Sequence, residues 1–309
     1  MNRLRPYRDV ARRVGLPLVI ALLVGACSPD AQPPKRPTPA AASEGPTDES
    51  LAPQSQSSAA ADPEPDPRVD EVIAILTVPP ADAGGEAENA WLDGRRAFME
   101  SLGPDSAELG RVMVDAFEAR PEIDVAVRRG MIEAIARTQC EGGAELLARL
   151  VGEYGVDLGV RTTAAERLWL ASPDIAIATL EPLLRDEPRG TYPPEESLLA
   201  GWLDAMNARD DDPTAVLTLI ATDLYREDAA RHLAVKSLGK CKTDGSRAAL
   251  EAVLIESTGN AYLRRMAAQQ VVLAFDADEA CELLERVLNR EADMNMQIFL
   301  ANLVTQNCP

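Results

Sequence analysis

Histidine, the side chain most often used for acid–base catalysis, is nearly absent from this sequence. The 309 residues include a single histidine, His232, which is too few for a histidine-based zinc or haem site. A Ser-His-Asp arrangement would have to use His232, and no Gly-x-Ser-x-Gly motif is present to supply the nucleophile. We interpret His232 as a packing or surface residue of a helix, and we predict no catalytic residues.

Two acidic runs are the next candidates, because Ca²⁺ prefers oxygen ligands. They occupy residues 210–212 and 276–279. Both runs directly precede predicted helices, and both lack the glycine and the distal glutamate of an EF-hand loop. Capping and the helix dipole explain acidic residues at a helix start. The sequence therefore predicts no metal site and no cofactor.

The N-terminus has the pattern of a signal peptide. Five arginines precede an uncharged, largely apolar run over residues 14–24, which is too short to span a bilayer as a helix. The run ends in Val24-Gly25-Ala26-Cys27. This stretch resembles a bacterial lipobox, and the resemblance implies that residues 1–26 are removed and that Cys27 carries lipid. The alternative is an ordinary secretory cleavage at Ala26 that leaves Cys27 as a thiol.

The charge of the chain bears on its partners. The 31 basic and 50 acidic residues give a formal net charge of −19. An acidic chain is repelled by nucleic-acid phosphates and by anionic headgroups, so we predict no nucleic-acid partner and expect the membrane to be reached through acyl chains on Cys27. The lipoprotein resemblance implies a location in the bacterial cell envelope, and Ser28 after the cysteine favours the outer membrane, on its periplasmic or surface face.

Residues 27–66 differ in composition from everything that follows. They are rich in proline, alanine, serine and acidic residues, and large apolar residues are nearly absent. Such a segment buries too little surface to offset the entropy of ordering, so the sequence predicts a disordered linker. We expect it to act as a flexible tether with a reach of roughly 35 Å.

Residues 67–309 repeat a pattern at helical spacing. In the clearest copies an arginine such as Arg128 follows an acidic residue or asparagine by four positions, and apolar residues stand one before it and three, four and seven after it. We call the arginine the index position of the repeat. The seven index positions are residues 95, 128, 161, 196, 231, 264 and 297, of which 95, 196 and 297 belong to weaker copies. Their spacing of 33 to 35 residues, with a second apolar helix in each interval, predicts helix pairs that stack on a shared core.

The pattern resembles HEAT repeats, in the short form found in bilin-lyase-like proteins, where Val-Arg followed by Ala three residues later is typical, as in Val160-Arg161 and Ala164. The resemblance implies an all-α, right-handed superhelical solenoid of about six helix pairs, whose curved surface binds another protein. We expect an N-terminal helix over residues 67–78 and a C-terminal capping helix over residues 291–307.

The repeat frame limits how the other cysteines can pair. Cys281 lies in the first turn of a second helix, and Cys308 lies at the end of the antiparallel capping helix. We therefore predict a Cys281–Cys308 disulfide, which closes a loop of about 27 residues. Cys140 and Cys241 are three repeats apart, too far to bond in a regular stack. We interpret them as thiols at the edge of the core, with a rearranged pairing as the alternative.

Aromatic residues are the candidates for a binding surface, because aromatic anchors dominate protein interfaces. The candidates are Trp91, Trp169, Trp202 and Tyr192. Each tryptophan falls within or beside a first helix and is equally explained as core. Tyr192 lies in the least regular repeat, where longer turns favour a docking edge. The index arginines would form a basic stripe, but their regular placement favours a structural ladder.

These observations predict a lipid-anchored envelope lipoprotein whose solenoid is a non-catalytic scaffold for protein–protein interaction, with an envelope protein as its partner. One alternative is an enzyme or enzyme subunit, because bilin-lyase-like proteins with such repeats include catalytic members. The other alternative is structural reinforcement of the envelope without a discrete partner.

Overall fold

The computed structural model describes residues 66–79, 84–186, 193–256 and 260–308. These residues form α-helices and no strand. The helices are α1 (Pro67–Leu76), α2 (Gly84–Ser101), α3 (Ala107–Ala119), α4 (Val125–Thr138), α5 (Gly143–Gly152), α6 (Leu158–Ala171), α7 (Pro173–Arg185), α8 (Glu195–Arg209), α9 (Thr214–Thr222), α10 (Asp228–Cys241), α11 (Asp244–Glu256), α12 (Ala261–Ala274), α13 (Ala277–Leu288) and α14 (Met294–Asn307). No described helix is both long enough and apolar enough to cross a membrane.

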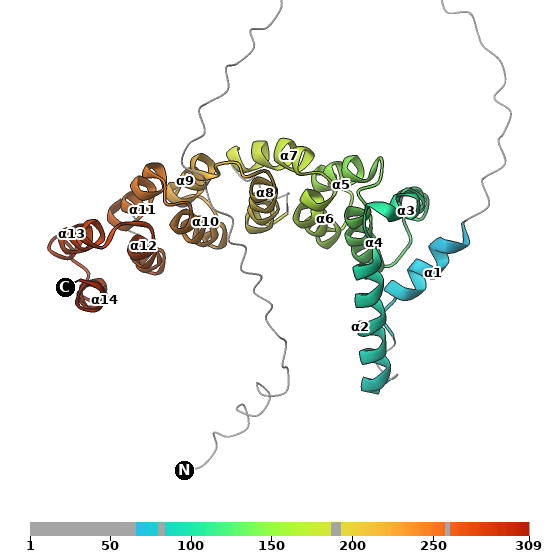
Figure 1. The fold of residues 1–309 in the computed structure, drawn as a ribbon, viewed down its shortest axis with the longest axis horizontal. Helices are drawn as coiled ribbons and strands as arrows, with labels where there is room; N and C mark the ends of the chain where they lie inside the picture. Colours follow the sequence, from blue (N-terminus) through green and yellow to red (C-terminus); the bar gives the residue numbers. More distant parts are fainter. Residues whose placement is uncertain (1–65, 80–83, 187–192, 257–259, 309) are drawn as a thin grey trace, which may run out of the picture.

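The helices stack in pairs into an arched solenoid, so the predicted fold class, an all-α HEAT-like solenoid, is confirmed (Figure 1). The first helices of the pairs, α4, α6, α8, α10, α12 and α14, follow one another along the inner side of the arch. The second helices, α3, α5, α7, α9, α11 and α13, follow its outer side. One apolar core runs between the two layers from end to end. The lipobox and nearly all of the predicted linker lie outside the described residues.

The first helices begin where the sequence places their caps. In four first helices the residue four before the index position accepts a backbone N–H of the helix start, as Asp157 does from Gly159 and Val160 at 2.8 and 3.2 Å, whereas Glu227 makes no such bond at α10. Asp124, Asn260 and Asp293 cap α4, α12 and α14 in the same way. These side chains satisfy amides that have no partner within the helix.

The N-terminal end departs from the predicted frame. Index position Arg95 falls on α2, but Met99 is the only buried residue of that helix, and α2 projects away from the stack (Figure 1). α1 packs against α4 in its place. Leu76 of α1 fits against Gly130 of α4, where an added Cβ would lie 2.9 Å from a Leu76 methyl carbon. α1 thus covers the N-terminal end of the core, as the sequence predicts for residues 67–78.

The fourth repeat corrects a second part of the frame. The first helices from α4 to α14 begin at intervals of 33 residues, except for 37 residues between the starts of α6 and α8. The extra four residues lie in the segment between α7 and α8. The fourth index position is therefore Leu198, three residues after the start of α8 like the index residues of the other repeats, and the sequence-based choice of Glu196 is wrong by two positions.

Candidate functional site

The index arginines form a structural ladder inside the solenoid. Three of them donate to the backbone carbonyl ten residues earlier, in the last turn of the preceding second helix, at 3.0 to 3.5 Å. The pairs are Arg161 with Val151, Arg231 with Ala221 and Arg264 with Leu254. A cation at a helix C-terminus satisfies free carbonyls and complements the helix dipole. The ladder that the sequence favoured is present, and its bonds go to helix ends.

The repeat without an index arginine has a replacement for it. Leu198 cannot donate to the end of α7, and Arg226 does so from the turn before α10. Its Nη1 donates to Asp186 O at 2.9 Å and its Nη2 to Arg185 O at 3.3 Å. This function of Arg226 lies outside the repeat pattern, so the sequence frame gave no sign of it.

A buried ion pair holds Arg226 in place. Its Nη1 lies 2.8 Å from Glu195 Oε1, and the two side chains are 2% and 1% exposed. Glu195 Oε2 also accepts the backbone N–H of Glu227 at 3.2 Å. Burial raises the pKa of the Glu195 carboxyl, and this N–H and the Arg226 charge act in the opposite direction. The pair joins α7, α8 and α10 at the least regular point of the solenoid.

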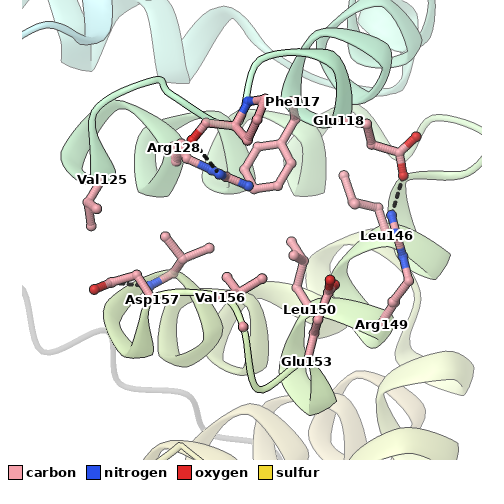
Figure 2. Close-up of a pocket in the computed structure, with 13 residues that line it drawn as sticks. Phe117, Glu118, Val125, Arg128, Leu146, Arg149, Leu150, Glu153, Val156 and Asp157 are labelled. Atoms are coloured by element: carbon pink, nitrogen blue, oxygen red, sulfur yellow. Dashed lines mark hydrogen bonds and ion pairs between the residues drawn. The ribbon is translucent and has the colours of Figure 1, made fainter.

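A groove of about 630 Å³ opens between the turn that joins α3 to α4 and the turn that joins α5 to α6 (Figure 2). We call it the Arg128 groove. Apolar side chains from four helices and from the second turn line it, and Val125 at its mouth is 41% exposed. The apolar lining residues are Phe117, Val125, Leu146, Leu150, Val156 and Val160.

Arg128 is the index residue of its repeat, but it does not donate to the carbonyl ten residues earlier as the ladder arginines do. Its guanidinium stacks on Phe117, with Cζ 4.1 Å from the ring centroid. Its Nη1 donates to Pro121 O at 3.1 Å, and within the described part of the chain its buried Nε has no hydrogen-bond partner. A guanidinium carries five N–H donors, so most of the donor capacity of Arg128 is unused in the groove.

The other charged groups of the groove differ in how they are engaged. Arg149 forms an ion pair with Glu118, and Asp157 caps α6 through two backbone N–H groups (Figure 2). Glu153 also lines the groove. The groove thus combines an apolar floor with a stacked, underused arginine, which suits a side chain that carries both an apolar part and a hydrogen-bond acceptor.

At the C-terminal end, a second index arginine pairs with a carboxylate of the chain. Arg264 donates to Leu254 O through Nε and forms an ion pair with Glu291 through Nη2, and both side chains are nearly buried. Glu291 Oε1 accepts the backbone N–H groups of Ala292 and Asp293 at 3.0 and 2.9 Å. Burial acts to raise the pKa of Glu291, but the bonds from Arg264 and from the two N–H groups outweigh it and lower that pKa.

The lowered pKa predicts an acid-sensitive C-terminal end. A carboxyl whose pKa is lower in the folded chain than in the unfolded chain adds stability above its unfolded pKa of about 4.3, and this stability is lost as the pH falls through the folded pKa. We expect Glu291→Gln to be less stable than wild type at pH 6, and the difference to shrink at pH 3. Urea unfolding at both values measures it, and a difference that is the same at both would contradict the assignment.

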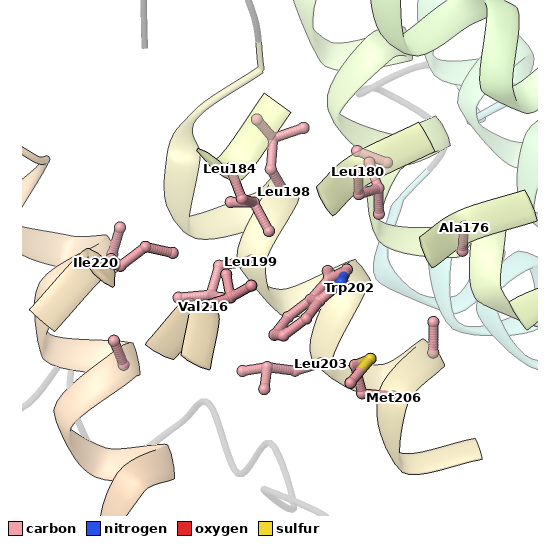
Figure 3. Packing of buried hydrophobic residues seen from close by; sticks show 14 of the residues in the cluster. Ala176, Leu180, Leu184, Leu198, Leu199, Trp202, Leu203, Met206, Val216 and Ile220 are labelled. Carbon is pink, nitrogen blue, oxygen red and sulfur yellow. The ribbon is translucent and has the colours of Figure 1, made fainter. Parts of the chain in front are cut away.

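Trp202 is not an interface residue. It is 1% exposed and packs in the core among residues such as Leu180, Leu199 and Val216 (Figure 3). The prediction failed because the frame of the fourth repeat was misplaced. With Leu198 as the index, Trp202 falls four residues after it, at a core position of the repeat.

Of the other aromatic candidates, Trp91 and Trp169 lie on different helices, α2 and α6. Trp91 is half-buried on α2, where its indole N–H donates to Ile75 O of the α1 end at 3.0 Å. Trp169 of α6 is half-buried against the core. Interface roles for these two residues stay a prediction. Tyr192 lies outside the described residues.

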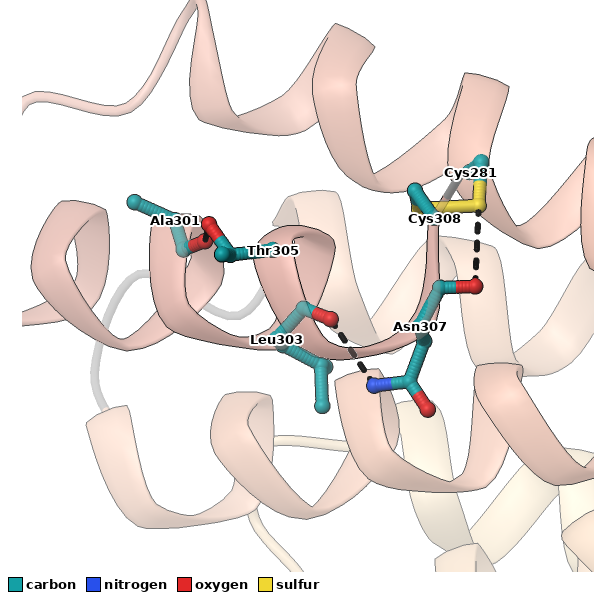
Figure 4. The surroundings of a disulfide bond; sticks show 6 residues. All are labelled: Cys281, Ala301, Leu303, Thr305, Asn307 and Cys308. Atoms are coloured by element: carbon teal, nitrogen blue, oxygen red, sulfur yellow. Dashed lines mark hydrogen bonds between the residues drawn. A yellow bond between two sulfur atoms is a disulfide. The ribbon is translucent and has the colours of Figure 1, made fainter.

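The disulfide predicted between Cys281 and Cys308 is present, with Cα atoms 5.7 Å apart (Figure 4). It fastens the end of α14 to α13 and closes the last helix onto the stack. Cys140 and Cys241 are buried thiols, as the sequence suggested. Cys27 lies outside the described residues, together with Val24, Gly25 and Ala26.

His232 and Asp204 are titratable groups on the first helices. The His232 ring of α10 meets the Tyr262 ring of α12 edge-on at 4.8 Å between centroids, which is a packing contact. Burial raises the pKa of Asp204 on α8, and the charge of Arg167 opposes this. Across the described ranges, no group of three or more His, Cys, Asp or Glu residues is placed to bind a metal ion.

Comparisons with known proteins assign no family to this chain. No protein-family model matches the sequence, and no curated protein matches it. A solved structure of human deoxyhypusine hydroxylase in complex with glycerol is similar, with 14% identity and a TM-score of 0.31, over 78% of this chain and 96% of that one. The matched protein is an enzyme, so the prediction that the chain is not an enzyme is wrong as an inference from its repeats.

Proposed function

We propose that this protein is a protein-binding α-solenoid of the HEAT type, tethered in the bacterial cell envelope, and that the Arg128 groove is where a segment of its partner binds. One observation carries the proposal. The groove joins an apolar floor of six side chains to a guanidinium that packs on Phe117 and that, within the described chain, donates only through Nη1.

The size and lining of the groove support this function. Sites that hold a small ligand or a short peptide segment enclose about 300–1,000 Å³, with mostly apolar walls and a few polar groups that fix orientation. The Arg128 groove has a volume of about 630 Å³, and its walls combine apolar side chains with charged groups such as Arg128, Arg149 and Glu153. Phe117 and Leu150 provide apolar contact area, and the N–H groups of Arg128 provide directional hydrogen bonds that orient a bound segment. Desolvated aromatic and arginine groups at the centre of a site are those that contribute most to binding.

Photo-crosslinking in cells tests the proposed function. A photoreactive residue replaces Val125, which is 41% exposed and lines the groove, or Ala248, which is exposed on α11 and does not line it. We expect position 125 to give an adduct of discrete mass with one protein and position 248 to give none. No adduct at position 125, or the same adducts at both positions, would contradict the function.

The tether is tested separately through Cys27. If Cys27 carries acyl chains, wild-type cells fed a clickable fatty acid will label the protein, and it will sediment with membranes. Because stable anchoring needs more than one acyl chain, Cys27→Ala is expected to remove the label and to release the protein into the soluble fraction. Absence of label on the wild type would overturn the proposed location. Ser28→Ala, which keeps both Cys27 and the Cys281–Cys308 disulfide, serves as the matched control.

A further inference from the structure

We propose that the Arg128 groove selects a partner segment that places an aspartate or glutamate carboxylate on the Arg128 guanidinium, next to an apolar side chain that fills the groove. This inference rests on the proposed function of the groove and names the chemistry of its occupant. It comes from a comparison of the two ends of the same solenoid.

In the C-terminal repeat, a side chain of the protein itself fills the site that corresponds to the Arg128 groove. A smaller cavity of about 260 Å³ lies at the corresponding place, lined by Ile255, Arg264, Val287 and Glu291 among others. There Glu291 lies on the index arginine, as an ion pair between nearly buried side chains. The solenoid therefore already contains one site in which an index arginine at this junction holds a carboxylate.

Gly155 stands where Glu291 stands. The turn before α6 and the turn before α14 each have five residues, and Gly155 and Glu291 each precede the following helix by three positions. Gly155 lines the Arg128 groove, and a Cβ added to it would have no atom within 4 Å. The Arg128 groove is thus the same junction without the acidic side chain. A partner can therefore fill the space that Glu291 fills at the other end and can pair with the Arg128 guanidinium.

The guanidinium of Arg128 favours a carboxylate in the space beside Gly155. Guanidinium and carboxylate form charge-assisted, often bidentate hydrogen bonds, and these strengthen when apolar groups exclude water. The Arg128 guanidinium packs on the Phe117 ring and is bonded to Pro121 O, so little side-chain entropy is lost when it binds a partner. Two of the three groove carboxylates have partners: Glu118 forms an ion pair with Arg149, and Asp157 accepts N–H groups at the start of α6. Glu153 is therefore the groove carboxylate whose charge repels an acidic partner most directly.

Three labelled peptides provide the probe: acetyl-Ala-Leu-X-Leu-Ala-amide with glutamate, glutamine or lysine at X. Their dissociation constants are measured by fluorescence anisotropy with the whole chain in detergent micelles, at protein concentrations up to millimolar. We expect the glutamate peptide to bind at least tenfold more tightly than the other two. Equal binding of the glutamate and glutamine peptides, tighter binding of the lysine peptide, or no binding of the glutamate peptide would overturn the inference.

Variants of the groove sharpen the test. Gly155→Glu is expected to place a carboxylate on Arg128 as Glu291 does on Arg264, so it abolishes binding of the glutamate peptide while the melting temperature at neutral pH is kept or raised. Gly155→Ala, which adds only a methyl group in open space, leaves binding unchanged. Glu153→Gln removes a like charge and tightens binding two- to threefold. If Gly155→Glu binds the peptide as wild type does, the inference fails.

The two proposals fail separately. If position 125 crosslinks to a partner but the three peptides bind equally, the groove is an interface whose occupant is not acidic. If the glutamate peptide binds selectively but position 125 yields no adduct in cells, the carboxylate site stands and the proposed function falls.

Discussion

Replacing Glu195 with alanine is expected to destabilise the folded chain by about 3 kcal/mol, because the buried Arg226 loses one carboxylate and keeps only its partly exposed ion pair with Asp223. Arg226 would keep its bonds to the end of α7 but lose the carboxylate at 2.8 Å, in a site where both side chains are at most 2% exposed. Because folded domains are stable by only about 5–15 kcal/mol, the loss is large. Urea unfolding followed by circular dichroism measures it.

A double-mutant cycle separates the pair from its surroundings. Glu195→Leu combined with Arg226→Met replaces both charges by apolar groups, but it also removes the bonds of Arg226 to Asp186 O and Arg185 O, so we expect it to be less stable than wild type. We expect the double variant to be more stable than Glu195→Ala alone. The exposed pair of Arg96 and Asp93 serves as control, and Asp93→Ala should cost less than about 1 kcal/mol. Equal effects of Asp93→Ala and Glu195→Ala would contradict the role of the buried pair.

Replacing Gly201 with alanine is expected to destabilise the chain by about 3 kcal/mol, although the repeat pattern alone would recommend it. Ala164, Ala234 and Ala267 occupy the same position in other repeats, three residues after the index. At Gly201, however, a Cβ would lie 2.1 Å from Ala165 O and 3.0 Å from Ala165 C. Both atoms are backbone, so α6 and α8 would have to separate.

Gly94→Ala is the matched control for Gly201→Ala. Gly94 also lies within a helix, α2, and a Cβ there meets no atom within 4 Å. The effect of the substitution on stability is then set by helix propensity, and Gly94→Ala should stabilise the folded chain by up to about 1 kcal/mol. Thermal unfolding of both variants gives the comparison. If Gly201→Ala is as stable as wild type, the close approach of α8 to α6 is incorrect.

The fold was predictable because one repeat pattern encodes it many times. Each clear copy carries its cap, its apolar face and its index arginine, and helix pairs with these features can bury their faces only by stacking. The frame failed where the chain leaves the pattern. The four extra residues all lie before α8, whereas the sequence frame divided them equally between the intervals before and after Glu196. The index is therefore Leu198, and Trp202 lies in the core and not on a predicted surface. α2 failed because its apolar residues are too sparse to keep it in the stack.

The candidate site was only partly visible in the sequence. Arg128 was identified as a ladder residue, and nothing in its repeat indicates that it stacks on Phe117 instead of donating to the carbonyl ten residues earlier. That choice depends on side-chain packing between two turns. The contrast between Gly155 and Glu291 is present in the sequence, but it has meaning only once the two turns are known to be equivalent junctions. Glu195 and Arg226 are 31 residues apart and belong to no motif, so only the folded chain brings them together.

The central claim is that the Arg128 groove binds a partner through the space that Gly155 leaves open. Its most direct test is the yield of the position-125 crosslink in cells, compared between wild type, Gly155→Ala and Gly155→Glu at equal protein levels. We predict the same adduct at similar yield in wild type and Gly155→Ala, and at least a tenfold loss in Gly155→Glu. An undiminished adduct in Gly155→Glu would contradict the claim.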